Sequence, residues 1–527
     1  MECENKICFV AICDSNFFMG ALATVNSILE YYPESDIAII DYNSNLDIGL
    51  NEHQKILLTE NNNNIKIYDR DFFLKENRVI GAWQYKTYAV NDLLHSNNYD
   101  IIIGIDCDCC IVSNLDDIIN KCLDDGKIRG GKDGSGTYYD NSYMPYGFET
   151  NVKYDKYVSS SLYFIPNNEI NKNIMKDTAE FTNCAIYGPQ NIKIYPGHGD
   201  QGILNAVIYK HTKGNNVDLL ENNLWSMHWT YDNSIIVYEN DILINKTFNN
   251  KEMRSFHSPS MHKIWTKEYK NNINTEWIYA KFLNYVFLGT ICLVSNNNIN
   301  NIIDERYHHL LIDFINLKDK IEIINKNFKN IWDNLSVNFI NIIFKKTNIH
   351  RMMPLHISPI KGSMNKYIEL VKSLKDNSRV LEVGSYQGGS ILTLALSTFH
   401  KKHDFHTMES FMGNEDGTVD GWDLPKVENY LHNIKQVFPF LNIKTYKLQS
   451  ILGSKLFSDE FFDFIFIDGN HSSESVYNDI NAWLPKLKNG GILSGDDISW
   501  ESVSSGIKNA GINIEKECDL WWHIKNV

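Results

Sequence analysis

Short apolar runs alternate with helical patterns in two separate stretches of the chain, and this alternation limits the possible folds. In the first stretch the apolar runs are Ile7–Cys13, Ile37–Tyr42, Ile101–Ile105 and Ser159–Ile165, and the helical patterns include Met19–Tyr32 and Trp83–His95. In the second stretch the runs are Arg379–Val383, Asp404–Met408, Phe462–Ile467 and Gly490–Ser494. Strands that alternate with helices are typical of mostly parallel sheets. The sequence therefore predicts an α/β fold class with two such sheets.

The length of the chain agrees with two domains. A chain of 527 residues is too long for one hydrophobic core, and 43% of its residues are hydrophobic, so that sizeable cores can form. We predict a first domain over 1–295, a helical linker over 296–352 and a second domain over 353–527.

The predicted linker carries a heptad pattern. Its apolar residues follow one another at spacings of four and three, namely Leu310, Phe314, Leu317, Ile321, Ile324, Phe328, Ile331 and Leu335. Such a seam is typical of a coiled coil, which could join two chains as a homodimer through a helix over 310–335. The alternative is a long amphipathic helix that folds onto its own domain. Ile315, Ile323 and Trp332 favour this alternative, because they widen the stripe beyond a strict seam.

Charge and cysteine content exclude other classes of protein. Lys and Arg number 50 against 65 Asp and Glu, and no basic block stands out, so we expect no nucleic-acid surface. We expect the ten cysteines to be reduced thiols in the cores and not a secreted disulfide framework. The N-terminus is acidic where a signal peptide would be basic, and Lys281 and Asn284 interrupt the apolar stretch 277–294. We therefore expect a cytoplasmic protein without a transmembrane segment.

Two carboxylates follow the strand predicted over 101–105. Asp106 and Asp108 are one residue apart, so on an extended chain their side chains point the same way and can hold one divalent cation. Ligands also bind at the carboxyl ends of strands in open α/β sheets. The alternative is a strand-end turn with solvated aspartates, which is the commoner meaning of this tripeptide when it stands alone.

Four blocks in order favour the metal site, because together they resemble the family-8 glycosyltransferases over roughly residues 1–270. The blocks are the opening strand with Ala11 and Asp14, the Asp106-Cys107-Asp108 block, Gly199-Asp200-Gln201-Gly202, and the segment from Phe256-His257 to Lys263-Ile264-Trp265. The resemblance implies a GT-A (Rossmann-like) fold. It also implies transfer of a sugar from a UDP-sugar donor to a glycan or glycoconjugate acceptor, with retention of configuration.

The same resemblance implies a metal site for the first domain. Asp106, Asp108 and His257 would hold Mn²⁺, which suits a mixed set of carboxylates and imidazole better than Mg²⁺ does. Lys263 and, on a looser match, Lys86 would help the metal to neutralise the diphosphate leaving group.

Contacts to the donor follow from the resemblance as well. Ala11 and Asp14 would contact the uridine, and Asp200 and Gln201 would face the sugar and the reacting centre. The chain has Val158-Ser159-Ser160-Ser161 where the family has an Asn-Ser-Gly block, so the identity of the sugar stays open.

A glycine-containing turn follows the strand predicted over 379–383. Glu382, Gly384 and Gly388 form an E-x-G-x-x-x-G pattern, and glycines at such a turn let a ligand approach the backbone. The dinucleotide fingerprint would need a glycine where Tyr386 stands. Glu409 ends the next predicted strand, where a carboxylate can accept hydrogen bonds from ribose hydroxyls.

Two further strands of the second stretch also end in carboxylates. Asp468 follows the strand predicted over 462–467, and Asp496 with Asp497 follows the strand predicted over 490–494. Three oxygen ligands with open water positions suit Mg²⁺, and His471 lies within reach of the same site. The alternative for Asp496 or Asp497 is the cap of a following turn.

These patterns resemble the class I S-adenosylmethionine methyltransferases over about the last 165 residues. Within that class they resemble the metal-dependent O-methyltransferases that act on macrolide sugars. The resemblance implies a Rossmann-like domain in which Asp468, Asp496 and Asp497 bind Mg²⁺. His471 would be the general base that removes a proton from a metal-bound sugar hydroxyl.

The combined prediction is a bifunctional enzyme that transfers a sugar and methylates a sugar hydroxyl. One alternative keeps a single catalytic domain, with the first domain as a glycan-binding module because its Asn-Ser-Gly block is altered. A second alternative is a dimeric scaffold organised by the 310–335 helix, which would leave both carboxylate clusters without a role.

Overall fold

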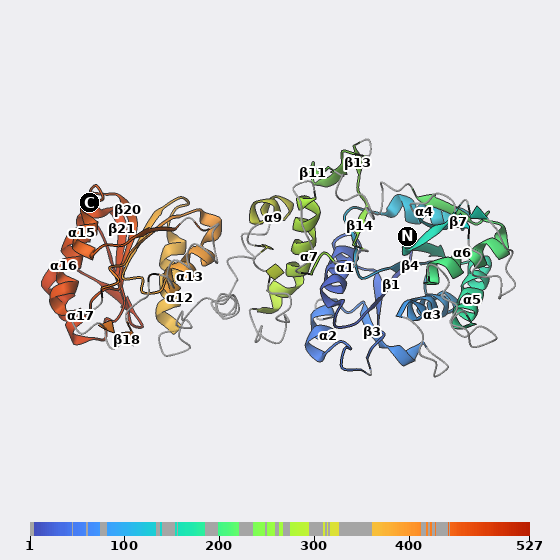
Figure 1. Ribbon diagram of the computed structural model, residues 1–527, viewed down its shortest axis with the longest axis horizontal. Coiled ribbons are helices and arrows are strands. Elements are labelled where there is room, and N and C mark those ends of the chain that lie inside the picture. The colour runs from blue at the N-terminus through green and yellow to red at the C-terminus, as the bar shows by residue number, and fades with distance from the viewer. Residues whose placement is uncertain are drawn as a thin grey trace. The chain divides into compact units, whose positions relative to one another are not determined.

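The structure is a computed structural model of the chain, shown in Figure 1. The residues it describes are 5–44, 46–59, 62–73, 82–132, 138–139, 153–154, 156–184, 199–220, 235–247, 250–258, 263–266, 275–294, 309–310, 313–314, 317–325, 361–412, 418–419, 422–423, 427, 441 and 443–526. The chain divides into two compact units. The first is Met1–Leu293 with Asn301–Lys326, and the second is Val294–Asn300 with Asn327–Val527.

A seven-stranded sheet forms the centre of the first unit, in the order β10-β6-β9-β4-β1-β2-β3. The bounds of its strands are β1 Ile7–Cys13, β2 Asp36–Asp41, β3 Ile65–Asp69, β4 Ile101–Ile105, β6 Ile128–Lys132, β9 Val158–Pro166 and β10 Val217–Leu220. Strands β4, β1, β2 and β3 are parallel, whereas β9 runs antiparallel to both of its neighbours. The four predicted strands are present within one residue at each end.

Helices and short strands complete the first unit. The helices are α1 Phe18–Tyr31, α2 Glu52–Thr59, α3 Ala82–His95, α4 Asp116–Asp125, α5 Glu169–Cys184, α6 Gly199–Thr212, α7 Glu276–Val294 and α9 Lys318–Ile324. The short strands are β5 Cys109–Ile111, β7 Tyr138–Tyr139, β8 Lys153–Tyr154, β11 Ile236–Glu239, β12 Ile242–Asn245, β13 Lys251–Glu252 and β14 Ser255–His257. The core cluster joins Val10 and Ile102 of the sheet to residues of α3, α5 and α6, such as Val90, Ile174 and Val207.

The apolar segment 277–294 lies in α7, which belongs to the first unit. Lys281 interrupts its apolar surface and donates a hydrogen bond to Glu30 at 2.8 Å. No helix within the described part of the chain is long and apolar enough to cross a membrane.

Of the helix predicted over 310–335, residues 326–335 lie outside the described part of the chain, and within the described part the helix is interrupted. Helix α9 ends at Ile324, because the backbone of Asn325 is extended (φ −122°, ψ 101°). The heptad pattern would continue the helix past Ile324. Instead, the side-chain amide of Asn325 donates a hydrogen bond to Asn284 Oδ1 of α7 at 3.0 Å. The seam residues Leu310, Phe314 and Ile321 are buried within the chain itself. Their burial agrees with the alternative in which this segment folds onto its own domain.

The second unit contains another seven-stranded sheet, in the order β19-β16-β15-β20-β21-β23-β22. Its strands are β15 Arg379–Val383, β16 Asp404–Met408, β19 Ile443–Tyr446, β20 Phe462–Ile467, β21 Leu487–Gly495, β22 Glu515–Glu517 and β23 Leu520–Ile524. The first five are parallel, and β23 runs antiparallel to β21 and β22. Three of the four predicted strands have their predicted bounds, and β21 is longer at both ends.

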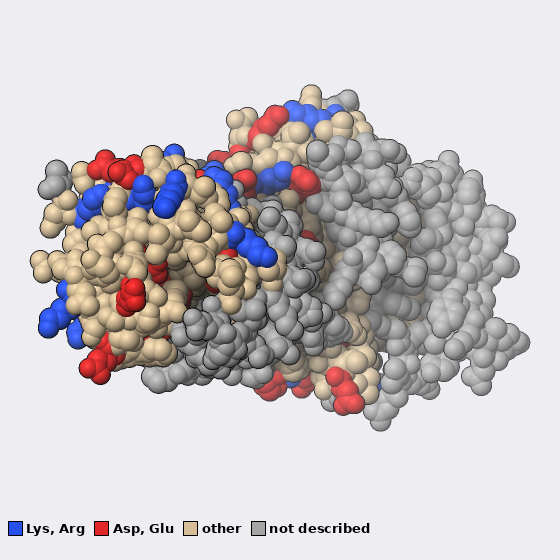
Figure 2. All heavy atoms as spheres, turned by 60° about the vertical axis from the view of Figure 1, so that its left-hand side comes forward, with Lys and Arg blue, Asp and Glu red and all other residues tan. Residues whose placement is uncertain are grey.

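Helices cover this second sheet, as Figure 1 shows. They are α12 Lys361–Ser373, α13 Gly389–Ser397, α15 Ser450–Ser454, α16 Ser473–Trp483 and α17 Glu501–Ala510, and a short hairpin consists of β17 Thr418–Val419 and β18 Trp422–Asp423. The core contains Leu381, Ile465 and Leu493 of the sheet with Trp483 and Trp521. On the face drawn in Figure 2, basic and acidic side chains of the described residues are interspersed. The predicted α/β fold class is confirmed, with one mostly parallel sheet in each unit.

Candidate active sites

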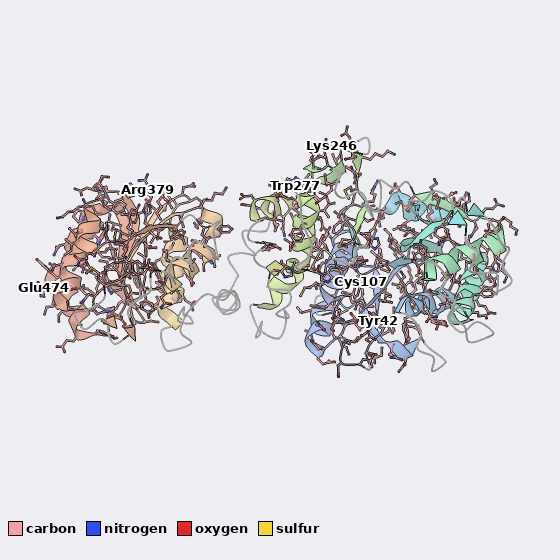
Figure 3. All side chains as sticks on the ribbon, viewed as in Figure 1. Tyr42, Cys107, Lys246, Trp277, Arg379 and Glu474 are labelled. Carbon is pink, nitrogen blue, oxygen red and sulfur yellow. The ribbon has the colours of Figure 1, made fainter. Side chains whose placement is uncertain are left out.

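The carboxyl end of β4 carries the first cluster of site residues. Asp106 directly follows the strand, and its backbone N–H donates to Ser161 O of β9 at 2.8 Å. Strand β5 then pairs with β14, which sets His257 opposite Cys109, and Ser258 N donates to Asp108 O at 2.8 Å. Cys107, labelled in Figure 3, lies in the turn between the two carboxylates. This pairing of two short strands brings His257 to the DxD segment.

Asp106, Asp108 and His257 converge as the sequence predicted. His257 Nε2 lies 3.0 Å from Asp108 Oδ1 and 3.9 Å from Asp106 Oδ2. One ligand atom from each of the three residues falls within 4.8 Å of the others, which is the spacing that a shared metal ion needs. Two carboxylates and an imidazole are a donor set that fits Mn²⁺.

Two lysines flank this cluster. Lys86, only 1% exposed, forms an ion pair with Asp106 Oδ1 and donates to Ser160 O at 2.8 Å. Lys263 forms an ion pair with Asp108 Oδ2 and donates to Ser258 O at 2.9 Å. Burial alone would raise the pKa of Asp108, but the charges and hydrogen bonds of His257 and Lys263 outweigh it and hold that pKa well below its usual range. The cluster therefore keeps Asp108 ionised and places two ammonium groups beside the carboxylates.

Gln201 joins the cluster through β9. Its Oε1 accepts a hydrogen bond from Ser160 N at 3.0 Å, on the same residue whose carbonyl oxygen contacts Lys86. Asp200 lies in the first turn of α6, and its side chain is outside the described part of the structure.

The residues predicted to contact uridine lie at the end of β1. Ala11 is buried within the strand. Asp14 precedes α1, and its Oδ1 accepts from the backbone N–H groups of Asn16 and Phe17 at 2.9 and 3.1 Å. Its Oδ2 accepts from Tyr42, labelled in Figure 3, at 2.8 Å. Asp14 thus fixes the β1–α1 turn, and its contact with a nucleotide stays a prediction.

The glycine turn after β15 is shaped by a close approach of backbones. Gly384 has φ +86°, and a Cβ atom there would lie 1.9 Å from Asp468 O, so no larger residue fits. Gly388, also in the left-handed region, is the N-cap of α13. Glu409, at the end of β16, accepts from the backbone N–H groups of Tyr386 at 2.9 Å and Phe411 at 3.1 Å. Burial raises the pKa of Glu409.

A cavity of about 320 Å³ opens at the carboxyl ends of the parallel strands. Its lining includes Gly384, Glu409 and Asp468 of the predicted site. It also includes Gln449 and Asp479, which the sequence did not indicate. Both belong to segments without a recognisable motif, so only the fold shows that they face this cavity.

Glu382 is placed differently from the residues that line the cavity. It is fully buried, and its two carboxyl oxygens accept from Ser390 Oγ at 2.7 Å and Tyr367 Oη at 3.1 Å. Glu382 therefore ties β15 to α12 and α13, and its direct contact with a cofactor stays a prediction.

The substitution Glu382→Gln is expected to change how stability depends on pH. Burial raises the pKa of Glu382 from 4.5 to about 8. Between these values the folded chain keeps a proton that the unfolded chain has lost, so the free energy of unfolding falls as pH rises through this window. The slope for one proton is about 1.4 kcal/mol per pH unit. Thermal unfolding should be measured at pH 5 and pH 8.5. The stability of the glutamine variant relative to that of the wild type should be greater at pH 8.5 than at pH 5. An equal difference at both pH values would contradict the assignment.

Acidic residues and a histidine form the second cluster at the ends of β20 and β21. His471 Nε2 lies 2.9 Å from Asp497 Oδ2 and 3.4 Å from Asp468 Oδ1. These three residues can share a metal ion, and so can Asp496, Asp497 and Asp519. The sequence did not indicate Asp519. Its carboxylate accepts from Ser499 N at 2.8 Å and Ser499 Oγ at 3.0 Å, so its main contacts stabilise the loop after β21.

The environment of Asp496 indicates whether a cation fits this second cluster. Its Oδ1 is buried and has no hydrogen-bond partner among the residues that the structure describes. Burial, followed by the charges of Asp468 and Asp497, raises the pKa of Asp496 to about 8. An unpaired buried oxygen beside two further carboxylates is a set of hard oxygen donors that fits Mg²⁺.

Residues 381–498 match a family model described as a methyltransferase domain. The second unit contains a methyltransferase domain. The matched residues include the glycine turn, Glu409 and the second carboxylate cluster through Asp497. The prediction of a methyltransferase domain in the second unit is therefore confirmed.

Other comparisons give similarities of fold. No curated protein matches the chain. The galactosyltransferase LgtC, solved with donor and acceptor sugar analogues, is 17% identical over 53% of this chain and 95% of its own, with a TM-score of 0.35. The glycosyltransferase GlyE of Streptococcus pneumoniae is 12% identical over 96% of this chain and 98% of its own, with a TM-score of 0.32. The O-methyltransferase NovP is 14% identical over 31% of this chain and 78% of its own, with a TM-score of 0.25.

Proposed function

We propose that the chain is a bifunctional transferase. Its first unit transfers a sugar from a UDP-sugar to a glycan or glycoconjugate acceptor in a metal-dependent, retaining reaction. Its second unit uses S-adenosylmethionine to methylate a sugar hydroxyl. The observation that carries the proposal is a separate cluster, at the strand ends of each unit, of side chains that could hold a metal ion.

The first cluster is suited to a diphosphate leaving group. Asp106, Asp108 and His257 would hold Mn²⁺, which supplies positive charge to the phosphate oxygens when it is bound. Lys86 and Lys263 are already fixed by Ser160 O and Ser258 O, so their ammonium groups need little reorganisation to neutralise further negative charge. Asp200 and Gln201 would face the donor sugar.

The second cluster is suited to an attacking hydroxyl. S-adenosylmethionine would occupy the cavity, where Glu409 could accept hydrogen bonds from its ribose hydroxyls. Asp468, Asp496 and Asp497 would hold Mg²⁺, which lowers the pKa of a coordinated sugar hydroxyl. His471 would take the proton, and Asp497, at 2.9 Å, would orient the imidazole and stabilise its protonated form.

Incubation with UDP-sugars, Mn²⁺, oligosaccharide acceptors and S-adenosylmethionine tests the proposal. We expect UDP release that needs Mn²⁺, together with methyl groups on the glycan product. A first screen would follow UDP release from each common UDP-sugar with water as the acceptor. Methylation of small phenols with none on glycans would contradict the proposed methyl acceptor.

A second candidate function keeps only the methyltransferase active, with the first unit as a glycan-binding module. The observation in its favour is Ser159-Ser160-Ser161 on β9, where the resemblance leads one to expect an Asn-Ser-Gly block. UDP release that disappears in Asp106→Ala would exclude this candidate. Glycan binding by a wild-type chain that releases no UDP from any donor would support it.

A further inference from the structure

Trp500 is an exposed aromatic residue beside the proposed general base. It directly precedes α17 and follows the loop that carries Asp496 and Asp497. Its side chain is 43% exposed. Its ring centroid lies 5.0 Å from that of His471, with an angle of 46° between the two rings. One part of the indole therefore contacts the imidazole while another part faces solvent.

The backbone on both sides of Trp500 is held in place. Trp500 N donates to Asp497 O at 2.9 Å, and Ser504 N of α17 donates to Trp500 O at 3.0 Å. Asp519 holds the preceding residue through Ser499 N and Ser499 Oγ. The fold thus fixes the backbone that presents a large apolar ring at the surface, so little entropy is lost in ordering the loop when a ligand stacks on the ring.

The charges around Trp500 indicate the class of ligand that it can receive. His471 contacts the ring and in turn lies beside the carboxylates of Asp468 and Asp497. Asp519 holds the neighbouring Ser499, and Glu501 follows Trp500 in the chain. A flat apolar ring beside such a polar cluster suits a neutral molecule with a C–H face and a rim of hydroxyl groups. Binding sites commonly combine aromatic walls with a few polar groups that orient the ligand. A pyranose ring has this character.

Exposed apolar residues elsewhere in the second unit lack this context. Ile451, Leu452 and Leu456 are also exposed, and Ile451 lines the cavity, but none of the three has an aromatic ring and exposed apolar residues are ordinary on a protein surface. The contact with His471 distinguishes Trp500, because His471 is where the acceptor hydroxyl must lose its proton.

We propose that Trp500 is the stacking platform for the methyl acceptor. A neutral pyranose packs its C–H face on the exposed indole and directs one hydroxyl toward His471 and the carboxylate cluster. This inference rests on the proposed function, since it assumes that the acceptor is a sugar. Beyond the proposed function, the inference assigns the selection of the acceptor to Trp500. It also predicts that the acceptor sugar is uncharged.

Kinetics of Trp500→Ala and Trp500→Phe in the full-length chain test the platform. The probes are the methyl glycosides of glucose, galactose and mannose, with Mg²⁺ and S-adenosylmethionine, and the best wild-type acceptor is carried forward. We expect the alanine variant to raise KM for the glycoside by about ten-fold, which corresponds to a loss of about 1.4 kcal/mol of acceptor binding. The phenylalanine variant should recover part of this loss. Tyr477→Ala, which removes another exposed aromatic ring of the second unit, is the matched control.

Three results separate the possible roles. Binding of S-adenosylhomocysteine, measured by calorimetry, should stay within about two-fold of wild type in both variants, because Trp500 does not line the cofactor cavity. An unchanged KM in Trp500→Ala, or a loss confined to kcat, would overturn the platform and leave Trp500 as support for His471. A wild-type chain that methylates no glycoside refutes the proposed function itself, and the inference falls with it.

Discussion

Asp108→Asn is expected to reduce sugar transfer by about 10³-fold or more, while methyl transfer by the same preparation stays at the wild-type level. Asp108 is buried and contacts both His257 and Lys263, so its carboxylate joins the imidazole ligand to one of the ammonium groups. Loss of this carboxylate removes a proposed metal ligand and the partner of Lys263 together. Metal ions contribute several kcal/mol to such reactions, and about 4 kcal/mol corresponds to a factor of 10³ in rate. The measurement is UDP release with Mn²⁺, beside methyl transfer to a glycoside.

A matched control for Asp108→Asn lies at the opposite end of the same strand. Asp100 precedes β4, is exposed, and accepts a hydrogen bond from Lys6 N at 2.8 Å. Asp100→Asn should leave both activities within about two-fold of wild type, as is usual for surface changes. Full UDP release in Asp108→Asn would mean that the first cluster is not the metal site. Loss of both activities, with a lower unfolding temperature, would indicate a damaged fold instead.

Strands were predicted well where the sequence marks both their interior and their ends. Ile101–Ile105 and Phe462–Ile467 are apolar runs in the middle of a sheet, and each is followed by an aspartate at the edge where the strand stops. The heptad pattern over 310–335 could not predict that helix α9 ends at Ile324, because it reports which positions are buried and not what buries them. Leu310 and Ile321 are indeed buried, yet Asn325 leaves the helix to contact α7.

The sequence predicted the site residues that lie in recognisable motifs. The sequence indicated His257, but the strands that bring it to Asp108 have three residues each, too few for a pattern to show. Glu382 lies in a recognisable motif, but the motif does not show whether its carboxyl group faces the cavity or the core. Asp519 and Trp500 belong to no recognised motif. The fold brings Asp519 beside Asp496 and Asp497, and it brings the ring of Trp500 beside His471.

His471→Ala is expected to lower methyl transfer by about 10²- to 10⁴-fold, the usual contribution of a positioned general base. The imidazole lies beside Asp468, Asp497 and the ring of Trp500, and the structure shows no other histidine among the candidate metal-binding groups of the second unit's described residues. Binding of S-adenosylmethionine should be unchanged, because His471 is not among the residues that line the cofactor cavity. His523→Ala on β23 removes another histidine of this unit and serves as the control.

The pH dependence of the His471→Ala variant distinguishes a general base from a metal ligand. Without the imidazole, hydroxide must remove the proton from the sugar hydroxyl, so the rate of the variant should rise by about ten-fold per pH unit. The variant should also still lose its remaining activity when Mg²⁺ is chelated, since Asp468, Asp496 and Asp497 are intact. If His471 instead holds the metal, excess Mg²⁺ should restore activity and higher pH should not. Rescue by Mg²⁺ alone would therefore contradict the assignment of His471 as the base, while leaving the carboxylate cluster as the metal site.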